Sequence, residues 1–204
     1  MKTTATLLAL AASASAFAPL QSTKSSVALN EFANGYVGAE GPEPIPFSPS
    51  GTSVAFDPCG FAERAPEWLP WFREAELKHG RAAMLATVGF VMPEFVRVPG
   101  EAYSFEAIPK VIDAHDALPQ SMIQIFGWIS FLEACSFAAL ANMNEFDRAP
   151  GDFGFDPIGL YPTDPAKQEE YKLSELKNGR LAMIAIGGMV AGASITGNGF
   201  PYLP

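Results

Sequence analysis

Three segments of the chain carry apolar residues over lengths that suit a helix crossing a membrane. The clearest is 118–143, which is apolar apart from a few polar residues, and about 20 such residues suffice to span a bilayer as a helix. Segments 71–92 and 166–195 begin with charged residues and end in runs of Ala, Gly, Met and Ile, so hydropathy alone indicates them weakly. The pattern predicts an all-α membrane protein with three transmembrane helices near these ranges.

An internal repeat relates the first and third segments. The hexapeptide at 76–81 reads ELKHGR, and ELKNGR follows 99 residues later at 175–180. The match extends upstream without a gap to Phe-Asp-Pro at 56–58 and 155–157, and a constant offset over that distance indicates homologous units. Two homologous helices with one span between them cross in the same direction. A pseudo-twofold axis along the membrane normal should therefore relate the crossed first and third helices, with the second antiparallel to both.

Each copy of the repeat places one glutamate and one arginine inside a predicted span. A charged residue there costs roughly 2.5 to 3.5 kcal/mol on insertion scales, so these residues must pair or line a site. Within one helix the two side chains lie about 140° apart, which disfavours pairing along the helix. We therefore expect reciprocal pairs, Glu76 with Arg180 and Glu175 with Arg81. The small residues expected to let the two helices approach are Gly80, Ala82 and Ala86 in one and Gly179, Gly188 and Gly192 in the other.

His79 and Asn178 occupy the same position of the repeat, and each lies about 160° around the helix from the arginine. They should face lipid or a bound molecule. Their neutral lone pairs, like a glutamate compensated by arginine, suit a metal with one vacant axial position, such as a tetrapyrrole magnesium. Two alternatives stay open. These residues could simply hydrogen-bond the helices together, or Glu-x-x-His could be half of a di-iron site, although the second copy carries Asn178 and only three helices are predicted.

The middle segment carries two further candidate ligands. Gln124 and Glu133 are nine residues apart, so they face opposite sides of a helix at depths that differ by about 13 Å. They cannot serve one ligand, but each could hold its own. The alternative is that Glu133 is protonated or bonded to a loop while Gln124 bonds a neighbouring backbone group.

The N-terminus has the composition of a targeting sequence. Residues 1–16 predict a signal peptide, with a basic start, an apolar stretch and a small-x-small end, and 17–30 have the serine-rich, acid-poor composition of a plastid transit segment. An ordinary secreted protein with an unstructured start is the alternative. Residues 31–204 would then form the mature domain.

Composition and charge exclude two classes of protein. The 204 residues are 49% hydrophobic and 17% charged with a net charge of −9, which gives no electrostatic basis for binding nucleic acid. Two cysteines cannot form a disulfide framework. Lys and Arg are more numerous on the side of the N-terminus, which predicts that this side is not translocated. The loop on the opposite side is acidic and contains Glu94, Glu101, Glu106, Asp113 and Asp116.

Together these motifs resemble those of the light-harvesting chlorophyll-binding proteins, the three-helix antenna family of thylakoid membranes. The hexapeptides at 76–81 and 175–180 match the family's two signature helices, and the start and short C-terminus resemble its fucoxanthin–chlorophyll a/c branch. The chlorophyll magnesium ligands expected on this basis are Glu76, His79, Gln124, Glu133, Glu175 and Asn178, with Arg81 and Arg180 as the partners of the glutamates.

The resemblance also implies roles for backbone and loop positions. Gly89 would offer a backbone carbonyl to a further chlorophyll, and Asp57 and Asp156 would lie near the end rings of two carotenoids, although Asp-Pro is also a simple turn signal. Gly192 departs from the family pattern, because many members carry a chlorophyll-binding Gln there.

The function implied by the resemblance requires no catalysis. Such a protein binds chlorophyll a, chlorophyll c and fucoxanthin or a related xanthophyll and passes excitation energy to a photosystem. Its expected partners are the pigments, other antenna subunits, a photosystem core and membrane lipid, and no nucleic acid. Its expected location is the plastid thylakoid membrane, as a multi-pass protein with a stromal N-terminus. The alternatives are a photoprotective quencher on the same scaffold and, more distantly, a membrane anchor or transporter without pigment.

Overall fold

The computed structural model describes residues 32–39, 57–141 and 148–202, which are helical and contain no strand. Its three long helices are α3 (Leu69–Phe95), α5 (Pro119–Ala141) and α6 (Pro165–Thr196). Short helical turns precede α3, namely η2 (Phe32–Gly35), α2 (Phe61–Arg64) and η3 (Pro66–Trp68). Others join α3 to α5, namely η4 (Glu101–Tyr103), η5 (Val111–Asp113) and α4 (Ala114–Ala117). The predicted targeting segments 1–16 and 17–30 lie outside the described residues.

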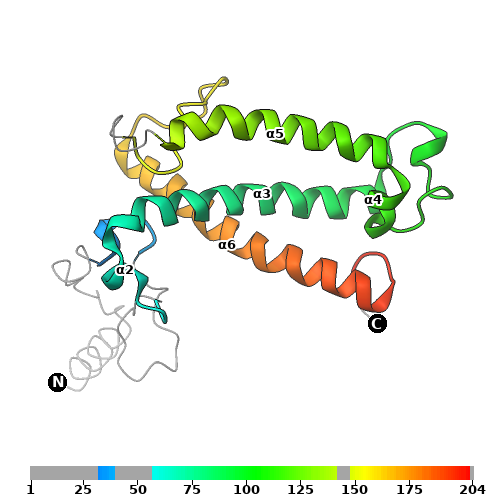
Figure 1. Ribbon diagram of the computed structural model, residues 1–204, viewed down its shortest axis with the longest axis horizontal. Coiled ribbons are helices and arrows are strands. Elements are labelled where there is room, and N and C mark those ends of the chain that lie inside the picture. Colours follow the sequence, from blue (N-terminus) through cyan, green and yellow to red (C-terminus); the bar gives the residue numbers. More distant parts are fainter. Residues whose placement is uncertain (1–31, 40–56, 142–147, 203–204) are drawn as a thin grey trace, which may run out of the picture.

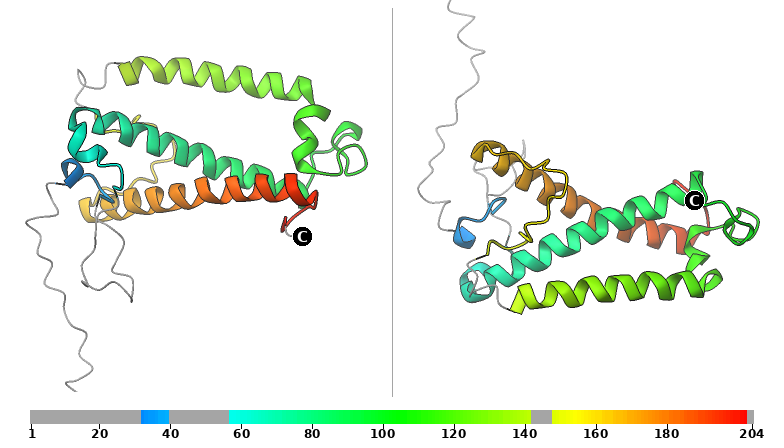
Figure 2. Two further views of the ribbon diagram at one scale, coloured as in Figure 1. Left: turned by 60° about the horizontal axis from the view of Figure 1, so that its bottom comes forward. Right: turned by 90° about the horizontal axis from the view of Figure 1, so that it is seen from above.

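The long helices form a crossed pair with a third helix beside it. Helices α3 and α6 run in the same direction and cross each other, whereas α5 runs in the opposite direction alongside α3 (Figure 1). The crossing is also visible from above (Figure 2). Local sequence defines where α6 begins and ends. The Asp164 side chain accepts a hydrogen bond from the Ala166 N–H at 3.2 Å, and Gly197 closes the helix with φ 66°, a left-handed conformation that suits glycine.

The crossing point lies at Gly80 of α3 and Gly179 of α6, which are equivalent positions of the repeat. A Cβ atom on either glycine would lie 3.0 Å from the Cα of the other, so no larger residue fits without moving a backbone. One turn further along, Ala83 and Ala182 are buried at 7% and 8% exposure. The repeat therefore brings its smallest residues together at the axis, as tight helix packing requires.

The prediction of a close approach is wrong for the other small residues. Ala82 and Ala86 are exposed, and Ala82 lies one position, about 100° around the helix, from the buried Ala83. A Cβ atom on Gly188 would meet no other atom within 4 Å, and Gly192 packs against the C-terminal segment instead of α3.

One helix of the described residues, α6, is long and apolar enough by length and composition to cross a membrane. The α5 helix exposes large apolar side chains, among them Ile123 at 71%, Phe126 at 72% and Trp128 at 69%. Apolar surface of this extent usually contacts lipid, ligand or another protein. The three-span arrangement remains a prediction for α3 and α5.

Replacing Gly80 by Val should lower the stability of the helix pair by about 1 to 3 kcal/mol, because its Cβ would meet the Gly179 backbone. Gly188→Ala is the matched control, since that position is helical and open, and it should be neutral or stabilising by up to about 1 kcal/mol. Thermal melting of the refolded protein, followed by circular dichroism, would compare the two. Equal melting temperatures would contradict the assigned crossing point.

Candidate functional site

Two reciprocal ion pairs flank the crossing of α3 and α6. Arg81 Nε lies 2.6 Å from Glu175 Oε1, and Arg180 Nε lies 2.7 Å from Glu76 Oε1. The structure thus forms both pairs that the repeat predicts. Each arginine therefore compensates the glutamate of the other helix.

The surroundings of the two glutamates are unequal. The second oxygen of Glu76, Oε2, lies 3.0 Å from Arg73 Nη1, so this carboxylate contacts two arginines. Among the described residues Glu175 forms an ion pair with Arg81 alone, and its Oε2 has no ion pair or hydrogen bond with any of them. The residue equivalent to Arg73 is Lys172, which is exposed and forms no ion pair in the described part of the chain. The repeat is therefore symmetric in its pairing but not in its charge.

A second pair of glycines extends the symmetry beyond the hexapeptides. Gly38 and Gly151 both have positive φ, +76° and +81°, and a Cβ on either would overlap a leucine side chain at equivalent positions, Leu176 and Leu77. Their carbonyls also accept from equivalent arginines. Arg81 Nη1 donates to Gly151 O at 2.8 Å. Arg180 Nη1, on α6, donates to Gly38 O at 3.5 Å. Each loop glycine therefore helps to fix the arginine of one ion pair through a hydrogen bond to its carbonyl.

A buried charge on α3 fixes one of these two glycines, Gly151. Glu74 is 3% exposed, and its Oε2 accepts from the Gly151 N–H at 2.5 Å and from Arg148 Nη2 at 3.2 Å. The Arg148 guanidinium also lies over the Phe153 ring. The equivalent of Glu74 is Leu173, whose side chain packs near Gly38. Sequence reasoning missed Glu74 and Arg148, because no counterpart marks them in the other half.

His79 and Asn178 are held alike by the preceding turn of their own helices. His79 Nδ1 lies 2.7 Å from Ala75 O, and Asn178 Nδ2 donates to Ser174 O at 2.9 Å. Carbonyls accept hydrogen bonds, so Nδ1 is the donor here, and in a neutral imidazole Nε2 then keeps its lone pair. The Asn178 Oδ1 atom is likewise left as an acceptor. Both side chains are exposed, so each presents one neutral lone pair outward from the crossed helices.

Gly89 carries a backbone acceptor without a helical partner. In α3 the carbonyl of Gly89 would bond to the N–H of residue 93, but that residue is Pro93 and has no N–H. No atom lies within 4 Å of a Cβ position on Gly89, so the space beside it is open. At the equivalent Gly188, residue 192 has an N–H. We therefore expect a carbonyl without a helical partner at Gly89 and not at the equivalent Gly188.

The two candidates on α5 lie in different surroundings. Lys78 of α3 forms an ion pair with Glu133 and also donates to Ser136 Oγ at 3.2 Å, which joins α5 to α3. Glu133 is therefore paired with a cation of the neighbouring helix. Gln124 is exposed on α5, and no described residue pairs with it.

Asp57 and Asp156 close equivalent turns ahead of α3 and α6. Asp57 Oδ2 accepts from the Ala62 N–H at 2.9 Å, and Asp156 Oδ2 accepts from the Tyr161 N–H at 2.9 Å, which is the same spacing in both copies. These backbone hydrogen bonds hold the pKa of both carboxyl groups below the usual Asp value. The stability they contribute is present above the ordinary pKa and is lost only as pH falls through the lowered one. The turn role predicted by Asp-Pro is therefore present.

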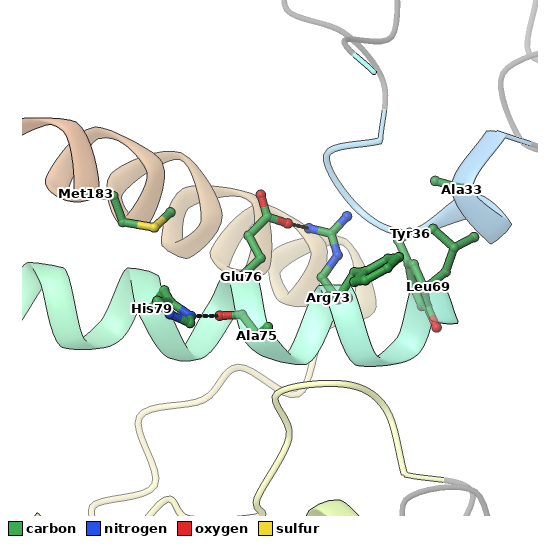
Figure 3. Close-up of a pocket in the computed structure, with 9 residues that line it drawn as sticks. Ala33, Tyr36, Leu69, Arg73, Ala75, Glu76, His79 and Met183 are labelled. Carbon is green, nitrogen blue, oxygen red and sulfur yellow. Dashed lines mark hydrogen bonds and ion pairs between the residues drawn. The ribbon is translucent and has the colours of Figure 1, made fainter. Parts of the chain in front are cut away.

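A cavity of about 440 Å³ opens beside α3, next to one ion pair. Its walls include Tyr36, Phe72, Arg73, Glu76 and His79, and Figure 3 shows Arg73 reaching Glu76 while His79 turns to Ala75. Burial raises the pKa of the Tyr36 hydroxyl above its usual value. The cavity thus combines aromatic walls, a cation and a candidate nitrogen ligand.

No group of three or more His, Cys, Asp or Glu side chains gathers into a metal site within residues 32–39, 57–141 and 148–202. A di-iron centre therefore finds no ligand set there. The single lone pairs on His79 and Asn178 suit a metal that already holds its other ligands.

Comparison with known proteins identifies the family. The chlorophyll a-b binding protein family matches residues 41–194, which is most of the chain. The chain belongs to the chlorophyll a-b binding protein family. The chain is 42% identical over 147 residues to the fucoxanthin-chlorophyll a-c binding protein of Chattonella marina var. antiqua, covering 71% of this chain and 66% of the relative.

Two further relatives cover more of the chain. The fucoxanthin-chlorophyll a-c binding protein F of Phaeodactylum tricornutum is 36% identical over 192 residues, covering 89% of this chain and 90% of the relative. The light-harvesting complex stress-related protein 1 of Chlamydomonas reinhardtii is 35% identical over 201 residues, covering 83% and 77%. All three relatives are named as chloroplastic, which supports a plastid location for this family member.

The structure leaves no room for a side chain at Gly192. A Cβ there would lie 2.8 Å from the carbonyl oxygen of Tyr202. Tyr202 is 5% exposed, and its hydroxyl donates to Phe90 O at 3.2 Å, so the C-terminal segment fills the space between the ends of α3 and α6. The departure from glutamine at this position therefore has a steric explanation.

Replacing Arg148 by Leu should destabilise the protein by about 3 to 5 kcal/mol, because it leaves the buried Glu74 carboxylate without its cation. The double variant Glu74→Leu/Arg148→Leu should be less destabilised than the single, since no charge then remains buried. Lys172→Leu, at an exposed position, is the control and should change stability by less than about 0.5 kcal/mol. Thermal melting would rank the variants, and a double variant worse than Arg148→Leu would contradict the pairing.

Proposed function

We propose that this protein binds chlorophyll a, chlorophyll c and fucoxanthin or a related xanthophyll in the plastid thylakoid membrane and transfers excitation energy to a photosystem. One observation carries this proposal. The two halves present one neutral lone pair each, at His79 Nε2 and Asn178 Oδ1, with the other polar atom of each side chain bonded to its own helix. Family membership and the fucoxanthin-chlorophyll a-c binding relatives support the choice of pigment.

The chemistry of the donor set fits chlorophyll. A tetrapyrrole supplies four ring nitrogens to its magnesium and leaves an axial position for one protein or water ligand. His79 and Asn178 offer neutral donors for that position, and Glu76 and Glu175 offer carboxylates whose charge is balanced by Arg180 and Arg81. Gln124 and Glu133 on α5 and the free carbonyl of Gly89 are the remaining proposed ligands. Asp57 and Asp156 are proposed to set the turns beside which carotenoid end rings lie.

The proposed arrangement in the membrane follows the repeat. Helices α3, α5 and α6 would each span the bilayer, with the pseudo-twofold axis through Gly80 and Gly179 and the N-terminus on the stromal side. Exposed apolar residues of α5 would then contact pigment or lipid. Energy transfer requires fixed separations and orientations of pigments, and no covalent bond is made or broken. Other antenna subunits and a photosystem core are the proposed protein partners.

Replacing His79 by Leu should remove one chlorophyll per polypeptide and leave the helix pair assembled, because His79 takes no part in the ion pairs. Arg180→Leu should also lower stability, since Glu76 then keeps only Arg73. The measurements are pigment stoichiometry after refolding with a pigment extract, and fluorescence excitation spectra for transfer to chlorophyll a. A wild-type protein that refolds without pigment would overturn the proposal.

A photoprotective quencher is the second candidate function, because one sequence similarity and one acidic loop favour it. The chain is similar to light-harvesting complex stress-related proteins at 35% to 39% identity. The loop between α3 and α5 also exposes Glu101, Glu106, Asp113 and Asp116, which lie on the side predicted to face the lumen.

If the protein is an antenna, its fluorescence lifetime in liposomes should change little as the lumen-side pH falls from neutral to about 5. Changing Glu101, Glu106, Asp113 and Asp116 to amides should then have no effect on the lifetime. Strong shortening in the wild type that disappears in the amide variant would instead favour the quencher.

A further inference from the structure

Three residues of α3 contact the loop glycine Gly151 from one side of the helix. Glu74, Leu77 and Arg81 are spaced i, i+3 and i+7, which places them in one row along α3. Glu74 Oε2 accepts a hydrogen bond from the Gly151 N–H at 2.5 Å, and Arg81 Nη1 donates to the Gly151 carbonyl at 2.8 Å. Between them the Leu77 side chain fills the place that a Cβ atom would take. Gly151 is therefore held at both of its polar backbone groups.

The loop that carries Gly151 is folded around the guanidinium of Arg148. Arg148 Nη1 donates to Asp152 O at 2.9 Å, and the guanidinium carbon lies 4.7 Å from the centre of the Phe153 ring. Arg148 Nη2 donates at 3.2 Å to Glu74 Oε2, the same oxygen that accepts from Gly151. Because Glu74 is buried and the Arg148 side chain is 15% exposed, little water competes for these bonds. The carboxylate thus fixes the loop to α3 through two donors.

The other half of the repeat shows the same contact without a carboxylate. The equivalent row on α6 is Leu173, Leu176 and Arg180, and both leucines lie against Gly38. The hydrogen bond from Arg180 Nη1 to Gly38 O is 3.5 Å long, against 2.8 Å for the matching bond on α3. A distance of 3.5 Å exceeds the usual range for such bonds. The shorter bond is therefore found in the half whose row contains an acid, Glu74.

The bond to the loop carbonyl bears on the carboxylate of Glu175. Arg81 Nε donates to Glu175 Oε1 at 2.6 Å while its Nη1 is held by Gly151, so the guanidinium plane is fixed at two points. Glu76 has a second cation, Arg73, to orient it, whereas Glu175 forms no second ion pair within the described residues. The direction of the remaining oxygen of Glu175, Oε2, thus depends on how Arg81 is held.

We propose that Glu74 and Arg148 are positioning residues for the Glu175 carboxylate. They act through Gly151, whose carbonyl holds Arg81 in place. This inference rests on the proposed function, in which Glu175 binds a chlorophyll magnesium, and deepens it by naming two residues that orient this ligand. Residues that orient a metal ligand typically change the affinity of a site by about 10- to 100-fold.

The test compares two changes of Glu74 in the full chain refolded with a pigment extract. Glu74→Leu/Arg148→Leu removes the acceptor for Gly151, leaves no buried charge and makes position 74 identical to Leu173. It should weaken the binding of one chlorophyll by about tenfold or more, and the absorption difference should match that of Glu175→Leu. Glu74→Gln is the matched control, because its amide oxygen still accepts a hydrogen bond, and it should retain that chlorophyll.

Combined variants distinguish positioning from a general weakening of the fold. Added to Glu175→Leu, the double leucine variant should remove no further chlorophyll, whereas added to His79→Leu it should remove a second one. Loss of all chlorophylls together in the double leucine variant would overturn the proposal. Retention of the Glu175-dependent chlorophyll there, or its equal loss in Glu74→Gln, would overturn it too.

A measurement without pigment separates this inference from the proposed function. Hydrogen exchange of the Gly151 amide, followed by NMR, should be about tenfold faster or more in the double leucine variant than in the wild type or Glu74→Gln. Unchanged exchange would refute the link from Glu74 to Gly151 and with it the proposal. A wild type that binds no pigment but shows this difference in exchange would refute the function and leave that link supported.

Discussion

The contact between Gly80 and Gly179 is the constraint on which the other interactions of the helix pair depend. With Cβ positions only 3.0 Å from the opposite backbone, the two helices approach closely enough for each arginine to reach the glutamate of its neighbour. The two ion pairs in turn balance the charges of two arginines and two glutamates at the crossing. The ion pairs therefore depend on the close approach of the two glycines.

The symmetry of the repeat explains what could be predicted from sequence. Partners such as Glu76 and Arg180 follow because the offset is constant and pairing within one helix is unfavourable. The contact face does not follow, since the angle at which two helices cross is not encoded in a residue spacing. Ala83 rather than Ala82 is buried, a difference of one position and about 100° around the helix.

Interactions that break the symmetry could not be found from the repeat. Glu74 of α3 pairs with Arg148, whereas the equivalent position in α6 is Leu173. Arg73 contacts Glu76, whereas Lys172 forms no ion pair with a glutamate of the described residues. A search for matching residues passes over such positions because they have no match. They nevertheless make the two halves chemically different, so two pigments bound at equivalent positions would meet different electric fields.

The paired loop glycines have a consequence for how the length of the chain can vary. Gly38 lies 19 residues before Asp57, whereas Gly151 lies 5 residues before Asp156, although both glycines contact equivalent leucines and both aspartates close equivalent turns. Closing the longer connection costs only about 1 kcal/mol more, because loop entropy grows with the logarithm of length. Insertions and deletions between these two anchors should therefore be the cheapest changes of length available to the sequence.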